Sequence, residues 1–459
     1  MIKKCALWLR DSFIRSRSLN ATRIVAGSFA AIILIGALLL TLPIASRDGQ
    51  SAGFFTGLFT ATSSTCVTGL ILVDTWTQWT LFGQAVILTM IQLGGLGFMT
   101  VITLVSFALH RRIGLSERLI MVSTLNLNDM DGVVRVVRHA LIGTFAMETA
   151  GAVLMSVCLI PEFGFLKGTW HAVFHAVSSF CNAGFDLLGG RFGAFSSLAG
   201  YNDNPLMLGT TAALIVVGGL GFFVWEDIVD KRCWSRLSVY SKMVLITAVL
   251  IVGGALFFLM EEFDNPATLG DMPLWQKGLN ALFQSVTLRT AGFDSIGQGG
   301  LSDTSKAMSC VLMLIGGSSG STAGGLKTAT VGVLLLALRS GLMGREQVTF
   351  RGRAIHYRRV LNAMTLALVV LFVFVFSSMV VSTVEDLPYL DSAFEVASAM
   401  GTVGLTTGIT PTLTPFSQGL LILLMYMGRV GILSFSIAFI TGNRHPAKIK
   451  YPEMNVMIG

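Results

Sequence analysis

A short pattern around a glycine recurs four times along the chain, at intervals of about 110 residues. Gly69, Gly184, Gly292 and Gly404 are each followed by Leu or Phe, and each follows a half-apolar stretch set between longer apolar ones. The half-apolar stretch has only about 10–13 residues, whereas a membrane-spanning helix needs about 20. Non-helical backbone at membrane depth is tolerated only where it is buried or lines water. The pattern therefore predicts a fourfold repeat of span, short helix, loop and span around a central aqueous path.

The composition is that of a membrane protein. Hydrophobic residues make up 53% of the chain, charged residues 12%, and the mean hydropathy is +0.73, which is outside the range of soluble domains. We expect an all-α membrane protein with eight transmembrane helices, the sixth of them interrupted, at residues 24–45, 81–109, 140–160, 206–224, 243–260, 306–338, 360–384 and 420–440. The short helices are predicted at residues 55–64, 170–180, 275–287 and 390–400.

These elements divide the chain into four repeats with polar segments around them. The predicted units are a cytoplasmic N-terminal tail at 1–23, repeat 1 at 24–109, a cytoplasmic loop at 110–139, repeat 2 at 140–230, repeat 3 at 231–342, repeat 4 at 343–440 and a cytoplasmic C-terminal tail at 441–459. Most of the 32 Lys and Arg residues fall in the tails and in alternate connections. That bias predicts a multi-pass protein with both termini in the cytoplasm. It also accounts for the net charge of +7 without nucleic acid as a partner.

Side chains that would carry enzymatic, metal or cofactor chemistry are sparse. The six cysteines are scattered without the paired spacing of a metal site. His171 and His175 are four positions apart, but the sequence between them lacks the glutamate of the zinc-protease motif. We therefore expect no enzyme, no resident metal and no bound cofactor. Cys66 and Cys181, which occupy equivalent repeat positions, are expected to pack as small residues behind the loops.

The glycine loops suit cation coordination by backbone carbonyls, because glycine allows the angles that turn carbonyls inward and keeps the lumen open. Each short helix ends with roughly −0.5 charge, so four such ends aimed at one path would attract a cation without a ring of carboxylates. Asp186 and Asp294 either attract cations at the outer mouth or stabilise the loops. The predicted contacts to a transported ion are Thr68, Gly69, Asn182, Ala183, Gly184, Thr290, Ala291, Gly292, Thr402, Val403 and Gly404.

The apolar stretch after the third glycine contains a run that cannot hold a stiff helix. Residues 316–325 are all Gly, Ser, Thr or Ala, so we predict a flexible loop inside the membrane. A hinge or gate is the favoured role, and a static plug is the alternative. The equivalent spans of repeats 1 and 2 carry Gly-Gly-Leu-Gly at 94–97 and 218–221, which close helix packing explains. The predicted gate residues are Gly316, Gly317, Ser318, Ser319, Gly320, Ser321, Thr322, Ala323, Gly324, Gly325, Lys327 and Arg429.

Charged residues within the spans need compensating partners. A charge in mid-span costs at least ~2.5–3.5 kcal/mol on insertion scales. Arg429 therefore either faces the pore, where it could steer the loop at 316–327, or reaches the cytoplasmic interface. Lys327 is nearer the end of a span, and it either reaches the interface or contacts the loop. Glu148 is expected to pair inside the membrane with Asn182 or Arg289.

Together these motifs resemble the Trk/Ktr/HKT superfamily of potassium transporters. The resemblance rests on the four glycine loops, the Leu-Arg-Thr-Ala-Gly-Phe run at 288–293, the Gly/Ser run at 316–325 and Met-Gly-Arg at 427–429. It covers about residues 24–440, and it looks most like the KtrB membrane subunit of bacterial Ktr systems because one span precedes the first short helix. It implies four repeats around one pore in each subunit. In this family, glycine at all four filter positions goes with potassium.

The resemblance also implies a biological setting. It implies a homodimer in the bacterial inner membrane, surrounded by membrane lipid, with a cytosolic nucleotide-binding regulatory ring (KtrA-like) as its partner. Potassium would be the transported ion, and sodium an activator or a coupling ion. The expected function is potassium uptake through a four-glycine filter, gated by the loop and the arginine. The alternative is a secondary transporter of an organic solute with broken helices, which leaves the four glycines unexplained.

Overall fold

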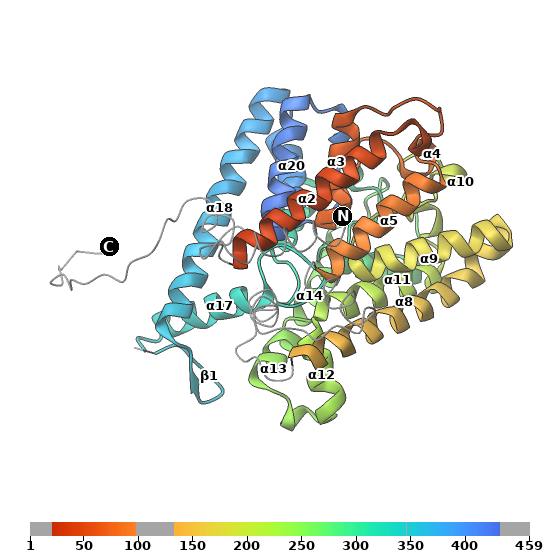
Figure 1. Ribbon diagram of the computed structural model, residues 1–459. Coiled ribbons are helices and arrows are strands. Elements are labelled where there is room, and N and C mark those ends of the chain that lie inside the picture. Colours follow the sequence, from red (N-terminus) through yellow and green to blue (C-terminus); the bar gives the residue numbers. More distant parts are fainter. Residues whose placement is uncertain (1–20, 98–132, 346, 432–459) are drawn as a thin grey trace, which may run out of the picture.

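The structure is built almost entirely from helices, as the composition predicts. The computed structural model describes residues 21–97, 133–345 and 347–431 (Figure 1). Among these residues, strands are limited to the antiparallel hairpin of β1 (Thr349–Phe350) and β2 (Arg353–Ala354). Most of the predicted tail at 1–23, most of the predicted loop at 110–139 and all of the predicted tail at 441–459 lie outside the described residues.

Each quarter of the chain supplies an outer helix, a short helix and an inner helix, in that order. In the first quarter these are α2 (Ala21–Thr41), α3 (Phe54–Cys66) and α5 (Leu81–Leu96). In the second quarter they are α8 (Val133–Phe163), α9 (Phe165–Cys181) and α11 (Pro205–Leu220), which α12 (Phe222–Lys231) continues.

The third and fourth quarters follow the same order. In the third, the outer helix is divided into α13 (Val239–Ile246) and α14 (Val249–Glu261), and the others are α15 (Leu274–Thr287), α16 (Asp303–Leu314) and, after a loop, α17 (Thr328–Leu342). In the fourth they are α18 (Tyr357–Glu385), α19 (Tyr389–Gly401) and α20 (Pro415–Val430). All four predicted short helices are therefore present, and α9 begins five residues earlier than predicted.

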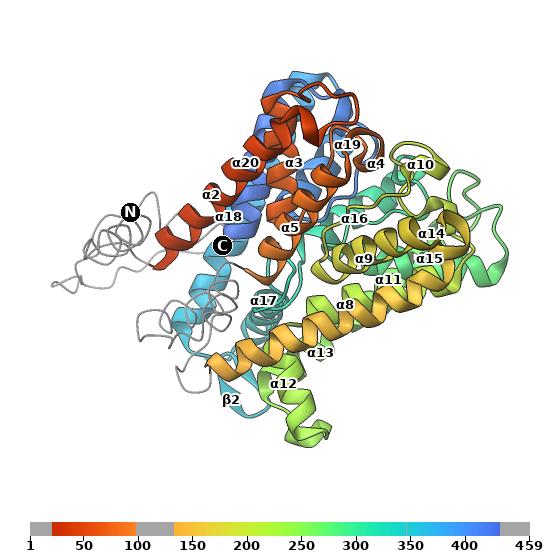
Figure 2. The same ribbon diagram turned by 45° about the vertical axis from the view of Figure 1, so that its right-hand side comes forward.

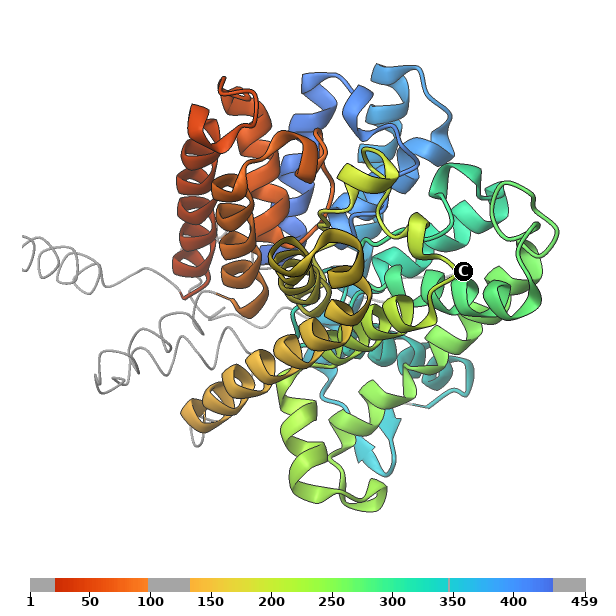
Figure 3. The same cartoon turned by 90° about the vertical axis from the view of Figure 1, so that its right-hand side faces the viewer.

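The four quarters close into a ring through contacts between neighbours. The inner helix of each quarter packs against the short helix of the next, so that α5 contacts α9, α11 contacts α15, α16 contacts α19 and α20 contacts α3. Figures 2 and 3 show these groups of helices side by side around a common centre. The arrangement brings the C-terminal ends of the four short helices together.

Burial is strongest on the short helices. One phenylalanine on each of them, Phe59, Phe174, Phe283 and Phe394, is at most 1% exposed. By contrast, large apolar side chains on the outer helices α2, α8 and α18 are widely exposed, as expected for surfaces that face lipid. The short helices and their loops are therefore the most deeply buried part of the core, to which the long helices contribute their inner faces.

The membrane-spanning elements agree only in part with the prediction of eight. Among the described residues, four helical segments are long and apolar enough to cross a membrane, and a fifth qualifies if α11 and α12 are taken as one bent span. Residues 98–109 and 432–440 of two further predicted spans lie outside the described residues. The span predicted at 206–224 is not straight, because the chain bends by 93° between α11 and α12.

Candidate cation pathway

Each short helix is followed, at once or within three residues, by the same unusual backbone conformation. The residue two positions before each glycine is left-handed, with φ of 57° at Val67, 61° at Asn182, 68° at Thr290 and 53° at Thr402. The four glycines follow with φ of 98°, 71°, 79° and 98° in chain order. A left-handed residue with a side chain costs roughly 1–2 kcal/mol, so four of them persist only because the surrounding structure fixes them. We call residues 67–69, 182–184, 290–292 and 402–404 the glycine loops.

The glycine loops touch one another in a closed ring. A Cβ atom placed on Gly69 would lie 2.7 Å from the carbonyl oxygen of Ala183, and one on Gly184 would lie 2.9 Å from the carbonyl oxygen of Ala291. In the same way, Gly292 faces the carbonyl oxygen of Val403, and Gly404 faces the carbonyl oxygen of Thr68. Each glycine thus lies against the carbonyl of the next loop, and the fourth closes on the first. Any side chain at these four positions would collide with backbone.

The predicted filter residues are all found at this ring. Thr68, Ala183, Thr290, Ala291, Thr402 and Val403 are fully buried, and Asn182 is 1% exposed. Asn182 Nδ2 donates to Thr290 Oγ1 over 3.3 Å. Among the described residues, the hydroxyls of Thr68 and Thr402 and the Oδ1 atom of Asn182 have no protein hydrogen-bond partner. Buried oxygens without a partner are costly, so the ring presents backbone and side-chain oxygens that a cation or water could satisfy.

A second set of residues, which the sequence analysis missed, anchors the glycine loops from behind. Ser63 Oγ accepts from Gly69 N over 3.0 Å, and Ser398 Oγ accepts from Gly404 N over 2.9 Å. Ser178 Oγ accepts from Phe185 N over 3.0 Å, and Thr287 Oγ1 donates to the Phe293 carbonyl over 2.7 Å. The available signal was a hydroxyl residue five or six positions before every glycine.

Carboxylates hold the segments that follow the loops. Fully buried Glu395 accepts from the hydroxyls of Thr406 and Thr410 over 2.5 and 2.6 Å. Asp294 accepts three backbone N–H groups over 3.0–3.2 Å, and Asp186 accepts the N–H of Leu188 over 2.9 Å. Burial is the main cause that raises the pKa of Asp186 to about 7. These bonds favour the stabilising alternative for both aspartates over a cation-attracting mouth.

Three of the inner helices end at an equivalent glycine. Gly97, Gly221 and Gly431 end α5, α11 and α20 with φ of 79°, 91° and 93°. Packing does explain the first glycine of each motif, since a Cβ on Gly94 or Gly218 would meet the backbone of Thr65 or Phe180. The packing interpretation was incomplete for repeats 1 and 2, because the last glycine of each motif terminates a helix.

In the third quarter the inner helix α16 is followed by a complete loop. Residues 315–327, the intramembrane loop, separate α16 from α17, as predicted. The Ser318 backbone N–H and hydroxyl both donate to the Gly219 carbonyl over 3.1 Å, and the Thr322 hydroxyl donates to the Phe180 carbonyl over 3.2 Å. A Cβ on Gly324 would meet the Thr402 side chain. The loop therefore lies directly against the end of α19 and the break after α11.

The two predicted cations of the gate both bond to backbone carbonyls. The Arg429 guanidinium donates to the carbonyls of Thr322 and Gly94, and to that of Gly95 over 3.2 Å. Lys327 Nζ donates to the Ala323 carbonyl over 2.7 Å. Arg429 thus links the intramembrane loop to the C-terminal end of α5, where the helix dipole favours a cation. For both residues, the contact with the loop is the alternative that the structure supports.

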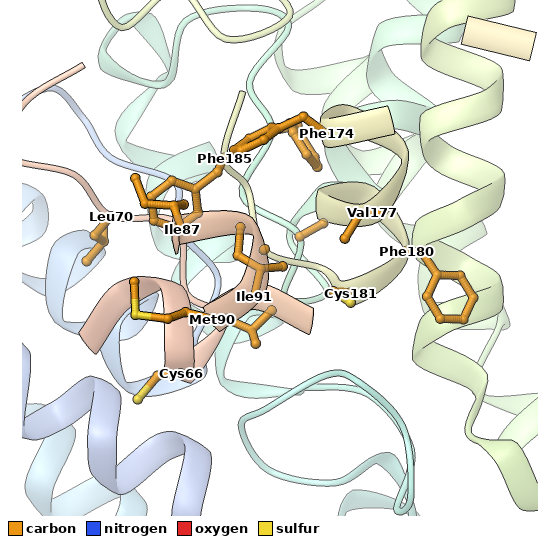
Figure 4. Close-up of a cluster of buried hydrophobic side chains, with 14 of the residues drawn as sticks. Cys66, Leu70, Ile87, Met90, Ile91, Phe174, Val177, Phe180, Cys181 and Phe185 are labelled. Carbon is orange, nitrogen blue, oxygen red and sulfur yellow. The ribbon is translucent and has the colours of Figure 1, made fainter. Parts of the chain in front are cut away.

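Other candidates have packing or pairing roles. Figure 4 shows the thiols of Cys66 and Cys181 among buried apolar side chains such as Met90 and Ile91. Glu148 bonds to Gln92 over 3.0 and 3.2 Å, so the predicted pairing with Asn182 or Arg289 was wrong.

The histidine pair is likewise embedded in aromatic packing. His171 contacts Trp76 and Phe163, and His175 contacts Phe293. Within the described residues, no group of three or more His, Cys, Asp or Glu side chains could hold a metal ion.

The apolar helices define a multi-pass membrane protein. A sequence profile of TrkH, described as a cation transport protein, matches residues 1–447. The chain therefore belongs to the TrkH family of cation transport proteins, and the resemblance drawn from its motifs is confirmed.

Relatives match the chain over nearly its whole length. It is 43% identical to the potassium/sodium uptake protein NtpJ of Enterococcus hirae, over 97% of this chain and 98% of that protein. It is 36% identical to the Ktr system potassium uptake protein B of Bacillus subtilis, over 98% of this chain and 99% of the relative. These relatives are named as cation uptake proteins rather than as enzymes, which confirms the expectation that the chain is not an enzyme. Neither name supports the organic-solute alternative.

A solved structure supports the fold. The potassium transporter TrkH from Vibrio parahaemolyticus superposes with a TM-score of 0.72, covering 93% of this chain and 86% of that protein. The two sequences are 17% identical, so this likeness concerns the architecture alone.

Proposed function

We propose that this protein takes up potassium through the ring of glycine loops. The observation that carries the proposal is the closed circle in which each glycine lies against the carbonyl of the next loop. Carbonyl oxygens arranged around a lumen replace the hydration shell of an ion, and four helix C-termini add negative potential at the same place. Two relatives are named as potassium uptake proteins, which supports this choice of ion.

The intramembrane loop and Arg429 form the gate in this proposal. The loop lies beneath the ring, against the Thr402 side chain, and it is tied to α5 through Arg429. Ions leaving the ring toward the cytoplasm must pass these groups. A loop of Gly, Ser, Thr and Ala has few large side chains to pack, so its position depends on its hydrogen bonds, among them those of Ser318, Thr322 and Arg429. A static plug would have the same contacts but would not respond to their loss.

The wider setting also belongs to the proposal. We infer a homodimer in the bacterial inner membrane, with four repeats in each subunit, both termini in the cytoplasm and a KtrA-like nucleotide-binding ring as regulator. The name Ktr system of a relative supports a multi-subunit assembly. Sodium acts as an activator or a coupling ion, in keeping with the potassium/sodium name of the relative from Enterococcus. No resident cofactor is part of this function.

Uptake of radioactive rubidium, a potassium surrogate, into proteoliposomes holding the purified chain tests the proposal. Uptake should be blocked by external potassium and not by an equal concentration of sodium. If the wild type is closed without its regulator, the Arg429→Ala variant should restore this potassium-blocked uptake. Absence of uptake from both folded proteins, or equal block by sodium, would contradict the ion assignment.

A further inference from the structure

The four hydroxyls behind the glycine loops do not anchor the same peptide. In the first and fourth quarters, Ser63 and Ser398 accept the N–H of the glycine itself. In the second quarter, Ser178 accepts the N–H of the residue after the glycine. In the third, the Thr287 hydroxyl donates to the carbonyl of Phe293, also beyond the glycine. The hydroxyls of the first and fourth quarters therefore hold the glycine peptide itself, whereas those of the second and third hold groups beyond it.

Holding the glycine N–H fixes the carbonyl that precedes it. The N–H of Gly69 and the C=O of Thr68 belong to one planar trans peptide and point in opposite directions. With the N–H held outward by Ser63, the Thr68 carbonyl must point inward, and it lies against Gly404. The same reasoning applies to Ser398, whose bond to Gly404 N turns the Val403 carbonyl toward Gly292.

We propose that Ser63 and Ser398 are specificity-determining positioning residues, whose hydroxyls hold the carbonyls of Thr68 and Val403 at the distance that suits potassium over sodium. The proposal rests on the proposed function. Sodium is smaller than potassium, so carbonyls must move inward or tilt to replace its hydration shell. A carbonyl whose peptide is anchored from behind resists that movement, and a freed one does not. Both serines are fully buried, so water cannot easily take over their bonds.

The neighbouring serines provide matched controls. Ser64 and Ser179 are also fully buried, and they differ from Ser63 and Ser178 by one position. Their hydroxyls donate within their own helices, to the carbonyls of Thr60 and His175, both over 2.6 Å. Removal of these hydroxyls changes volume and polarity to the same extent but frees no loop peptide. Ser63→Thr keeps the hydroxyl, as Thr287 does in the third quarter.

The test measures rubidium uptake into proteoliposomes at graded external potassium or sodium. The ratio of the sodium to the potassium concentration that halves uptake should fall about fivefold in Ser63→Ala and in Ser398→Ala, as expected for loss of one buried hydrogen bond. Ser64→Ala and Ser179→Ala should keep the wild-type ratio, and Ser63→Thr should recover most of it. Because selectivity is a ratio, a change in the amount of active protein does not affect it.

An unchanged ratio in folded Ser63→Ala and Ser398→Ala would overturn the inference, and so would an equal fall in Ser64→Ala. Thermal melting in detergent checks that each variant is folded. If only one of Ser63→Ala and Ser398→Ala folds, that variant is sufficient for the test. Failure of the wild type itself to prefer potassium would instead refute the proposed function. The two failures are therefore distinguishable.

Discussion

The glycine loops are alike in all four quarters of the chain, whereas the ends of the inner helices differ from quarter to quarter. Every glycine loop has a left-handed residue, a glycine of positive φ and a contact with the next loop. The inner helices α5, α11 and α20 end at the glycines 97, 221 and 431, whereas α16 is followed by a thirteen-residue loop at 315–327. Only the fourth quarter has an arginine, Arg429, at the position that Gly95 and Gly219 occupy in the first two.

We infer that this difference reflects two functions, the selection of the ion and the control of its passage. A ring that replaces a hydration shell needs oxygens from all sides, so each quarter must supply nearly the same backbone. A gate needs only one obstruction, and it can be built from one quarter and held by its neighbour. Arg429 of the fourth quarter does hold the loop of the third. We infer that selectivity is shared among the four quarters, whereas control is concentrated where the third and fourth meet.

The largest effect is expected from breaking the symmetry of the ring. In Gly404→Ser, the new Cβ would lie 2.9 Å from the Cα atom of Gly69 and closer still to the Thr68 carbonyl. The preference for potassium over sodium, measured by competition with rubidium uptake, should fall about thirtyfold, the factor that corresponds to a misfit of about 2 kcal/mol.

Gly408→Ala provides the control for backbone strain. Gly408 has φ of 101°, close to that of Gly404, but nothing lies within 4 Å of an added Cβ. This variant should lose stability without losing selectivity. Equal selectivity in Gly404→Ser and the wild type would contradict the claim that the ring of glycine loops selects potassium.

A smaller effect is expected from removing the arginine that links the fourth quarter to the intramembrane loop of the third and to α5 of the first. Arg429→Ala deletes the bonds to Thr322 and to the end of α5. Initial rubidium uptake should rise about tenfold at matched protein amounts, since bonds from a charged donor contribute about 1.5–3 kcal/mol. Arg191→Ala, which removes an ion pair with Glu162 and cation–π contacts with Phe163 and Phe192, should leave the rate unchanged. Equal or slower uptake in Arg429→Ala would favour a structural role for the loop.

The sequence predicts the parts of the ring that backbone conformation dictates. The sequence identified the four glycines of the ring because a glycine that recurs at even spacing indicates a backbone position that needs positive φ in every repeat. The intramembrane loop was predicted because ten consecutive small or polar residues cannot form a stable apolar helix. The family followed from the combination of these motifs.

The parts that were missed depend on contacts between distant segments. Ser63 looks like any small polar residue of a membrane helix until Gly69 is folded back onto it. Gly221 resembles a packing glycine, and its role as a helix break appears only with the bend. Gln92 and Glu148 are 56 residues apart, and their pairing requires α5 to meet α8. Local sequence does not contain such information.

The smallest effect is expected at the support of the fourth glycine loop. Glu395→Gln replaces an acceptor-only carboxylate by an amide, whose NH₂ group cannot accept from Thr406 or Thr410. The free energy of unfolding should fall by about 1–3 kcal/mol, visible as a lower melting temperature in detergent, while uptake by the folded protein keeps its preference for potassium. Glu385→Gln is the matched control, because Glu385 accepts from Thr414 at an exposed site. Equal losses in both variants would argue against a special role for the buried carboxylate.

The central claim, that four glycine loops converge on one cation site, is tested most directly by locating rubidium in crystals of the protein. The anomalous signal of rubidium should appear within the ring formed by Gly69, Gly184, Gly292 and Gly404, and it should be displaced by potassium but not by equal sodium. A rubidium signal absent from the ring and present elsewhere along the helices would contradict the account.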